Sequence, residues 1–221
     1  PVEQVMESLK YVDDVLNDLI DRNLEEPGDN VIAGLLENDL VLDDGTSRKL
    51  TKEELFGFCK LTIFAGGGTT WRQLGIVLEA LLTHYDFWEA CRSDRRLIED
   101  AVEESLRWRA TNPVFPRLCV EDTEIDGIFI PANTQVQLCV ATANHDPDVF
   151  ERPTEFDIFR PKEHHHGFGL GPHRCIGMDV ARQEMVLAIN ALMDRFPNMR
   201  LDRAHPAPRF EGLEHRGINA L

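Results

Sequence analysis

The stretch that most constrains the fold of this chain is residues 167–177, a loop in which four glycines surround a single cysteine, Cys175. Apolar residues recur at helical spacing from Met178 onward, so Cys175 should lie at or just before a helix N-terminus. Glycine lets backbone approach a flat ligand closely and leaves N–H groups free to face sulfur, while Pro172 stiffens the loop. Because N–H groups and a helix dipole stabilise negative charge, we expect the loop to present a thiolate.

A lone cysteine is more often a small apolar residue of a core than a ligand. The pattern around Cys175 favours a ligand, because a single thiolate presented in this way suits an axial position on haem iron. Residues 168–177 run Phe-Gly-x-Gly-x-His-x-Cys-x-Gly. This long pattern closely resembles the haem-binding loop of the cytochrome P450 family.

The charge and cysteine content exclude several classes of partner. The 221-residue chain has 39 acidic and 23 basic residues, a net charge of −16, which argues against nucleic-acid binding and against docking on anionic lipid. No apolar run approaches the ~18 residues of a membrane span. The five cysteines are widely spaced and odd in number, which favours a reducing compartment and gives no zinc signature. We therefore expect a cytoplasmic protein without a nucleic-acid or membrane partner.

Apolar periodicity divides most of the chain into helices. Helices are predicted over residues 1–24, 31–38, 51–84, 86–92, 95–109, 141–145 and 178–195. Strands are predicted over residues 117–120, 128–130 and 136–138, with Asp126-Gly127 as a hairpin turn. Residues 147–166 should be irregular, and residues 198–221 loop and short strand. The expected fold class is mainly α with a small β-sheet region, in a single domain over residues 1–221.

The helix predicted over residues 51–84 is unusually long. Thr51 and Glu54 form a capping-box pattern at its start, and at ~1.5 Å per residue it would extend roughly 50 Å. The three glycines at residues 66–68 each cost about 1 kcal/mol relative to alanine inside a helix. That cost indicates a local need, either close packing against another helix or space for a ligand, and the adjoining threonines 69 and 70 favour the ligand.

Glu104 and Arg107 are three residues apart on a predicted helix and can face each other. An exposed pair of this kind is worth only tenths of a kcal/mol and usually lies on a solvated face. Placed between the glycine-containing helix and the cysteine loop, the pair resembles the Glu-x-x-Arg motif of the cytochrome P450 family. The glycine helix, this motif, Arg117, the irregular segment and the cysteine loop follow the family's order. The resemblance implies the C-terminal portion of the cytochrome P450 fold.

The resemblance also implies roles for individual residues. Cys175 would be the proximal ligand of the iron in haem b, and Thr69 and Thr70 would be catalytic, relaying protons on the oxygen side. Glu104 and Arg107 would fix the proximal scaffold. Further haem contacts would come from Arg117 and His173, which would hold the propionates, and from Phe168, Gly169, Gly177, Ala65 and Gly66. The substrate side would be lined by Ala65, Gly66, Val114 and Phe115.

A member of this family would be a monooxygenase. The resemblance implies insertion of one oxygen atom of O2 into a small organic substrate. The electrons would come from NAD(P)H through a ferredoxin or a flavoprotein reductase. The substrate itself cannot be read from these residues.

Three departures from the family pattern keep alternatives open. Only about the C-terminal half of a family domain is present, so we expect part of a longer chain, and a non-catalytic haem-binding module is the alternative. Gly68 stands where the family usually has an acid before Thr69, which leaves peroxide-driven or non-hydroxylating chemistry open. Glu155 stands where an arginine often joins Glu104 and Arg107, so their network should be rebuilt or weakened.

The run His164-His165-His166 has the composition of a metal cluster or an expression tag. We favour neither, because the run is internal and abuts Gly167. It is better interpreted as the end of the irregular segment.

Overall fold

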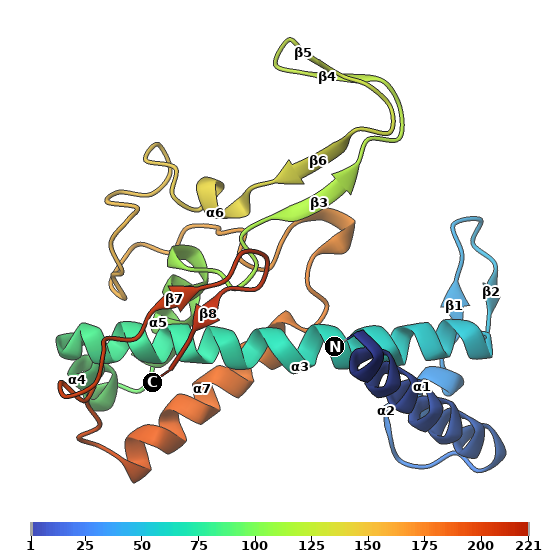
Figure 1. Ribbon diagram of the computed structural model, residues 1–221, viewed down its shortest axis with the longest axis horizontal. Coiled ribbons are helices and arrows are strands. Elements are labelled where there is room, and N and C mark those ends of the chain that lie inside the picture. The colour runs from blue at the N-terminus through green and yellow to red at the C-terminus, as the bar shows by residue number, and fades with distance from the viewer. Residues whose placement is uncertain (1, 221) are drawn as a thin grey trace. The chain divides into compact units, whose positions relative to one another are not determined.

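The computed structural model describes residues 2–220 of the chain. They belong to two compact units, Pro1–Gly67 and Gly68–Leu221, and the boundary falls inside one continuous helix, α3 (Lys52–Thr83), shown in Figure 1. The helix predicted over residues 51–84 is therefore confirmed, and residues 66–68 keep a helical conformation. A single domain over residues 1–221 stays a prediction.

The first unit is a small helical assembly. It contains α1 (Val2–Glu25), α2 (Val31–Glu37), the short strands β1 (Leu40–Val41) and β2 (Ser47–Arg48), and the first part of α3. Asn30 caps α2, because its Oδ1 accepts a hydrogen bond from the Ala33 N–H at 3.1 Å. Leu16 and Ile20 of α1 pack with Leu55 and Cys59 of α3 in a shared core.

The start of α3 has the capping box that the sequence predicts. The Glu54 N–H donates to Thr51 Oγ1 at 3.2 Å, and the Thr51 N–H donates to Glu54 Oε2 at 2.9 Å. Two backbone donors that the first turn leaves unpaired are thus satisfied reciprocally. Arg48 also contacts both carboxylate oxygens of Glu54.

The second unit is built around a helical core. The end of α3 packs with α4 (Tyr85–Ser93), α5 (Leu97–Trp108) and α7 (Met178–Arg195) through apolar side chains with no solvent exposure, among them Val77, Trp88, Ile98 and Ile189. In α5 the buried residues Ile98, Ala101, Val102 and Ser105 have helical spacing, and residues 104–107 at its end are buried on every side. Helices α5 and α7 lie against each other, and Gly167, in the segment before α7, lies close to Leu106 of α5.

The strands of the second unit form short antiparallel pairs. β3 (Phe115–Leu118) pairs with β6 (Gln135–Leu138), and β4 (Thr123–Ile125) pairs with β5 (Ile128–Ile130), as Figure 1 shows. Asp126 and Gly127 have φ values of 50° and 79°, the positive values of a hairpin turn, so that turn prediction is confirmed. β7 (Phe210–Glu211) pairs with β8 (Gly217–Ile218).

Most element boundaries differ from the prediction by one or two residues. The strand expected over residues 117–120 is β3, which begins two residues earlier because its pairing with β6 extends back to Phe115. The helix expected over residues 141–145 is α6 (Val140–Ala143), and it ends at Asn144. The fold class, mainly α with a small β-sheet region, is confirmed.

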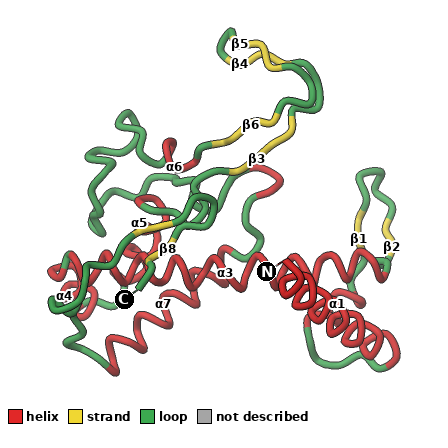
Figure 2. Tube along the Cα trace, in the orientation of Figure 1, coloured by secondary structure: helices red, strands yellow, loops and turns green. Residues whose placement is uncertain are grey.

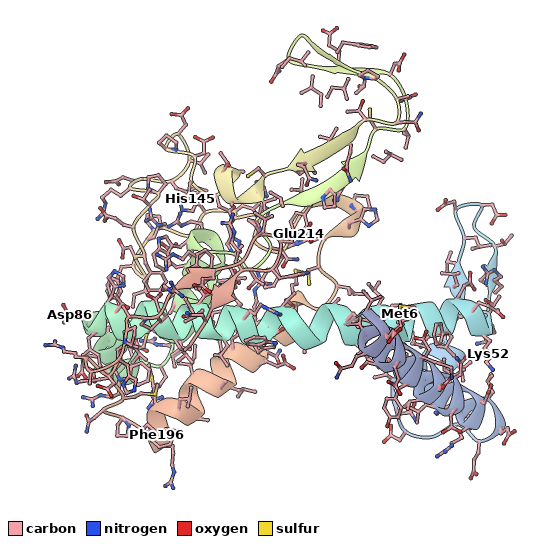
Figure 3. All side chains as sticks on the ribbon, viewed as in Figure 1. Met6, Lys52, Asp86, His145, Phe196 and Glu214 are labelled. Atoms are coloured by element: carbon pink, nitrogen blue, oxygen red, sulfur yellow. The ribbon has the colours of Figure 1, made fainter. Side chains whose placement is uncertain are left out.

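Between α6 and α7 the chain has little regular structure, as the loop colouring in Figure 2 shows. His145, labelled in Figure 3, lies at the start of this segment, and its Nδ1 is 2.8 Å from the Ala141 carbonyl oxygen. Among the described residues, the 3-10 helix η1 (Gly171–His173) is the only helix or strand in this segment. Across residues 2–220, none of the helices combines the length and apolar character that crossing a membrane demands.

Candidate functional site

The cysteine loop, residues 167–177, closes on itself before α7 begins. The Cys175 N–H donates to the Phe168 carbonyl oxygen at 2.9 Å. Gly169 and Gly171 both have φ of 70°, a conformation that glycine adopts without strain. Cys175 is exposed and lies three residues before Met178, the first residue of α7. The predicted position of the cysteine just ahead of a helix is confirmed.

Two of the four glycine amides of the loop are arranged differently from the sequence-based expectation. We expected glycine N–H groups to face the sulfur atom. Instead, the Gly167 N–H donates to Nδ1 of His165 at 3.0 Å, and the Gly169 N–H donates to the His166 carbonyl oxygen at 2.9 Å. These two hydrogen bonds therefore hold the loop to His165 and His166, the two residues that directly precede it.

Close packing explains why the loop contains glycine at its first position. A Cβ atom built on Gly167 would lie 2.8 Å from the Leu106 carbonyl oxygen of α5, closer than real Cβ atoms come to backbone. The same construction on Gly169 meets the Phe115 ring at 3.7 Å. Phe115 of β3, a predicted substrate-side residue, is thus brought to the cysteine loop.

A cluster of three charged or polar side chains borders the loop, and the sequence interpretation did not identify it. In this Glu103 cluster, Arg182 of α7 donates from Nε to Glu103 Oε1 at 2.6 Å and from Nη2 to Oε2 at 3.0 Å. His165 Nε2 is 3.1 Å from Glu103 Oε2. Desolvation opposes ionisation of Glu103, but hydrogen bonds from His165 and Arg182 and the Arg182 charge outweigh it and lower its pKa to about 2.

Glu104, the next residue on α5, lies in a second and more deeply buried network. Arg107 donates to it twice, from Nε to Oε2 and from Nη2 to Oε1, both at 2.8 Å. Arg160 adds a third bond, from Nε to Oε1 at 3.1 Å. The side chains of Glu104, Arg107 and Arg160 are only 6%, 2% and 7% exposed. The Glu104–Arg107 pair is therefore not part of a solvated face.

Of the two outcomes expected at Glu155, a rebuilt or a weakened network, the structure shows the rebuilt one. Arg107 Nη2 and Arg160 Nη2 donate to the main-chain carbonyl oxygen of Glu155 at 2.9 and 3.0 Å. The Glu155 carboxylate turns outward and pairs with Arg152 at 2.8 Å. Residue 155 thus serves the network through its backbone, and Arg160 supplies the arginine that the sequence interpretation sought at position 155. The sequence held no specific signal for Arg160, because Arg152 also stands directly before a proline in this segment and its side chain is exposed.

The candidate catalytic residues lie on α3. Thr69 and Thr70 are half-buried and helical, and Ala65 and Gly66, in the first unit, are exposed. Beside Thr69, the Gly68 carbonyl oxygen accepts a hydrogen bond from Arg72 Nη1 at 2.8 Å. A Cβ atom built on Gly68 would lie 3.0 Å from that nitrogen. The Arg72 guanidinium therefore lies beside Gly68, the position at which the sequence lacks the expected acid.

The remaining predicted haem contacts are spread along the second unit. Arg117 lies on β3 opposite Val136, is half-buried, and donates to the Pro116 carbonyl oxygen at 2.9 Å. His173 ends η1 and is exposed, and its carbonyl oxygen is 3.8 Å from a Cβ built on Gly169. Val114 is half-buried next to β3. The geometry thus joins Gly169, Phe115 and the His173 backbone.

The donor chemistry of the loop fits a cofactor that brings most of its own metal ligands. All five cysteines are free, and only Cys139 and Cys175 are exposed among them. Within the described part of the chain there is no group of three His, Cys, Asp or Glu side chains able to hold a metal ion, the histidine run included. A Cβ built on Gly171 or Gly177 would meet no described atom within 4 Å. A lone thiolate beside open glycine backbone suits the iron of a planar macrocycle.

Comparison with known proteins agrees with this geometry. A family model described as Cytochrome P450 matches residues 2–213. The chain is 37% identical over 200 residues to cytochrome P450 105C1 of a Streptomyces species and 36% identical over 210 residues to vitamin D3 dihydroxylase of Streptomyces griseolus. These matches cover 90% and 93% of this chain and 50% of each relative. The chain spans about half the length of these curated relatives.

A solved structure gives the same result for the fold. The structure of CYP109E1 from Bacillus megaterium in complex with corticosterone matches with a TM-score of 0.88 and 28% identity, over 97% of this chain and 56% of that chain. The family match spans nearly all of the described residues, and it includes the cysteine loop and both networks on α5. This chain belongs to the cytochrome P450 family.

Proposed function

We propose that the chain is the haem-binding part of a haem-thiolate monooxygenase that inserts one atom of O2 into a small organic substrate. The observation that carries the proposal is the exposed Cys175 in a glycine loop closed by the bond from its own N–H to the Phe168 carbonyl. Haem b, when bound there, would supply the oxygen activation, which a cysteine thiolate ligand favours because it donates electron density to the iron.

The residues of this chain have separate tasks in the proposal. Cys175 donates the thiolate, and the bases Arg117 and His173 pair with the propionates, since guanidinium–carboxylate bonds are strong and directional. The Thr69 hydroxyl, with Thr70 beside it, holds and passes protons on the oxygen side. The loop face toward the macrocycle is Phe168, Gly169 and Gly177. The substrate side is Ala65, Gly66, Val114 and Phe115.

The names of two relatives support a class of substrate. One relative is named vitamin D3 dihydroxylase and one solved relative holds corticosterone, which supports an apolar organic molecule as substrate. Electrons come from NAD(P)H through a ferredoxin or a flavoprotein reductase. The five free cysteines suit a reducing compartment, and we place the activity in the cytoplasm.

One observation favours a second candidate, a haem enzyme with peroxide-driven or non-hydroxylating chemistry. Arg72, and not an acid, stands beside the Gly68 carbonyl. A guanidinium stays protonated at physiological pH and cannot relay a proton in the way a carboxyl group does. Turnover with peroxide in the absence of a reductase, at a rate equal to or above reductase-driven turnover, would favour this candidate.

The test of the primary proposal is the absorption spectrum of the dithionite-reduced, carbon monoxide-bound protein. The wild type should show a strongly red-shifted Soret band, and Cys175→Ser should lose it because the thiolate ligand is gone. Cys139→Ser is the matched control, since Cys139 is also an exposed thiol. An unshifted band in the wild type, or the same band in Cys175→Ser, would contradict the proposal.

A further inference from the structure

We propose that His165 is a positioning residue for the cysteine loop. Its Nδ1 atom accepts a hydrogen bond from the Gly167 N–H and thereby fixes the backbone conformation of the loop that carries Cys175. The inference rests on the proposed function, because it concerns the orientation of the Cys175 thiolate toward the haem iron. His165 is not a ligand here. Its side chain is only 9% exposed, so its contacts are with protein groups.

The two ring nitrogens of His165 have different partners. Nδ1 lies 3.0 Å from the Gly167 nitrogen, which is a donor, and Nε2 lies 3.1 Å from Glu103 Oε2. An N–H donor can bond only to a ring nitrogen that carries a lone pair. The proton of the neutral imidazole therefore sits on Nε2 and is donated to Glu103, which leaves Nδ1 as the acceptor.

Glu103 keeps His165 in this tautomer because it is itself held as a carboxylate. Arg182 binds both of its oxygens, at 2.6 and 3.0 Å. A carboxylate accepts hydrogen bonds and donates none, so the ring nitrogen that faces it must carry the proton. The contacts therefore form a chain. Arg182 of α7 binds Glu103 of α5, Glu103 binds His165, and His165 accepts from the N–H of Gly167, the first residue of the loop.

The effect reaches Cys175 within two further contacts. Gly167 is followed by Phe168, whose carbonyl oxygen accepts the Cys175 N–H at 2.9 Å. The Arg182 guanidinium carbon also lies 4.7 Å from the centre of the Phe168 ring, a cation–π distance. A rotation of the Gly167 peptide would therefore move the acceptor that holds the Cys175 backbone.

An independent anchor means that loss of this bond should not unfold the loop. The His166 N–H donates to Asn144 Oδ1 at 2.7 Å, and Asn144 is fully buried. Asn144 is tied in turn to Arg107, which donates to its carbonyl oxygen at 2.9 Å. In variants of His165 the hydrogen bond between His166 and Asn144 remains, so the segment stays attached to the core one residue before Gly167. These variants therefore test the orientation of the cysteine loop and not its folding.

Three substitutions separate the two sides of the ring. Asparagine at this position can accept from the N–H two residues on, as in an Asx-turn, and so replaces Nδ1 alone. Glutamine can reach Glu103 with its amide donor but does not form that local bond, so it replaces Nε2 alone. Alanine replaces neither. His164→Ala is the matched control, because His164 is exposed and its recorded contact is with the His166 ring.

The experiment uses the full-length, haem-loaded protein and three readouts. They are the red-shifted fraction of the reduced carbon monoxide complex, the iron reduction potential, and hydrogen exchange of the Gly167 amide. His165→Ala and His165→Gln should exchange Gly167 about fivefold faster, the effect of one lost hydrogen bond, with a smaller red-shifted fraction and a displaced potential. His165→Asn and His164→Ala should match the wild type in all three.

The outcomes distinguish this inference from the proposed function. A wild type without the red-shifted band would contradict the proposed function, and the exchange of Gly167 would still report whether the hydrogen bond exists. A wild type with the band, and His165→Ala equal to it in all three readouts, would overturn the inference. Equal changes of the three readouts in His165→Asn and His165→Ala would also overturn the inference. The loss of an acceptor for the Gly167 N–H could not then be the cause, because asparagine replaces that acceptor.

Discussion

The Nε atom of Arg160 lies 3.1 Å from Oε1 of Glu104, and both side chains are almost entirely removed from solvent. The same oxygen accepts from Arg107 Nη2 and from the Asp157 N–H. The Glu104 carboxylate thus binds the guanidinium group of Arg107 on α5. It also binds the guanidinium group of Arg160 and the backbone amide of Asp157, both from the irregular segment. The irregular segment is held in place by these bonds, since it contains little secondary structure of its own.

Glu104→Gln should be strongly destabilising. The change would leave two buried guanidinium groups without their counter-charge, and breaking a buried pair in this way costs about 3–5 kcal/mol. Glu155→Gln is the matched control, because the network uses only the main-chain carbonyl of Glu155. That control should stay within about 0.5 kcal/mol of wild type in urea unfolding. Equal losses in the two variants would contradict this account of the network.

The Glu104–Arg107 half of this network could be predicted from sequence, and the Arg160 half could not. The first two residues sit on one helix, where spacing alone brings them together. Arg160 is 56 residues from Glu104 along the chain, in a segment whose path follows no repeating geometry. Only the tertiary structure shows that residue 155 takes part through its carbonyl oxygen and that residue 160 supplies the charge.

Gly167→Ala should destabilise the protein by about 1–3 kcal/mol, the usual cost of overpacking. The added methyl group would lie 2.8 Å from the Leu106 carbonyl oxygen, and backbone of α5 cannot move aside as a flexible side chain would. Gly34→Ala on α2 is the control, because a Cβ there meets no described atom within 4 Å, and it should gain about 0.5–1 kcal/mol. Thermal and urea unfolding would measure both, and a neutral Gly167→Ala would refute the packing argument.

Gly68→Asp should be tolerated in α3 and should pair with Arg72. An acid four residues before an arginine is favourably placed on a helix, and the pair is worth about 0.2–0.5 kcal/mol. The nearest described atom to the new Cβ is the mobile end of the Arg72 side chain at 3.0 Å. Gly67→Asp has Trp71 four residues on and gives the control. Added salt should lower the stability gained by the Gly68→Asp variant and leave that of the Gly67→Asp variant unchanged, because salt screens an ion pair. An equal effect of salt on the stability of both variants would rule out an ion pair with Arg72.

The same substitution bears on the reaction. An acid at position 68 should improve the coupling of NAD(P)H use to product only when Arg72 does not neutralise it, so Gly68→Asp with Arg72→Gln should exceed Gly68→Asp alone. Product formed per NAD(P)H consumed would measure this. No gain in either variant would favour the peroxide-driven or non-hydroxylating candidate.

The position of Cys175 ahead of a helix was predictable from the sequence, whereas the amide contacts of the cysteine loop and the Glu103 cluster beside it were not. Cys175 precedes α7, as the helical spacing of apolar residues from Met178 onward indicates. Local chemistry fixes such features. His165, by contrast, had three possible interpretations within a histidine run, and its partners Glu103 and Arg182 come from two helices that only packing of the core brings together.

Glu103 gives a pH dependence whose sign follows from its pKa of about 2 in the folded protein, against an ordinary value of 4.5. Because the folded-state pKa is lower, the unfolded chain binds the proton first as the pH falls, and the contribution of Glu103 to stability is lost between about pH 5 and pH 2. The stability difference between wild type and Glu103→Gln should therefore shrink over that range. Arg182→Gln should reduce the pH dependence of the Glu103 contribution, since the arginine supplies two of the bonds that lower this pKa. Urea unfolding of the three proteins at pH 5 and pH 3 would measure it, and a difference that does not change with pH would mean that Glu103 is not held as a carboxylate by His165 and Arg182.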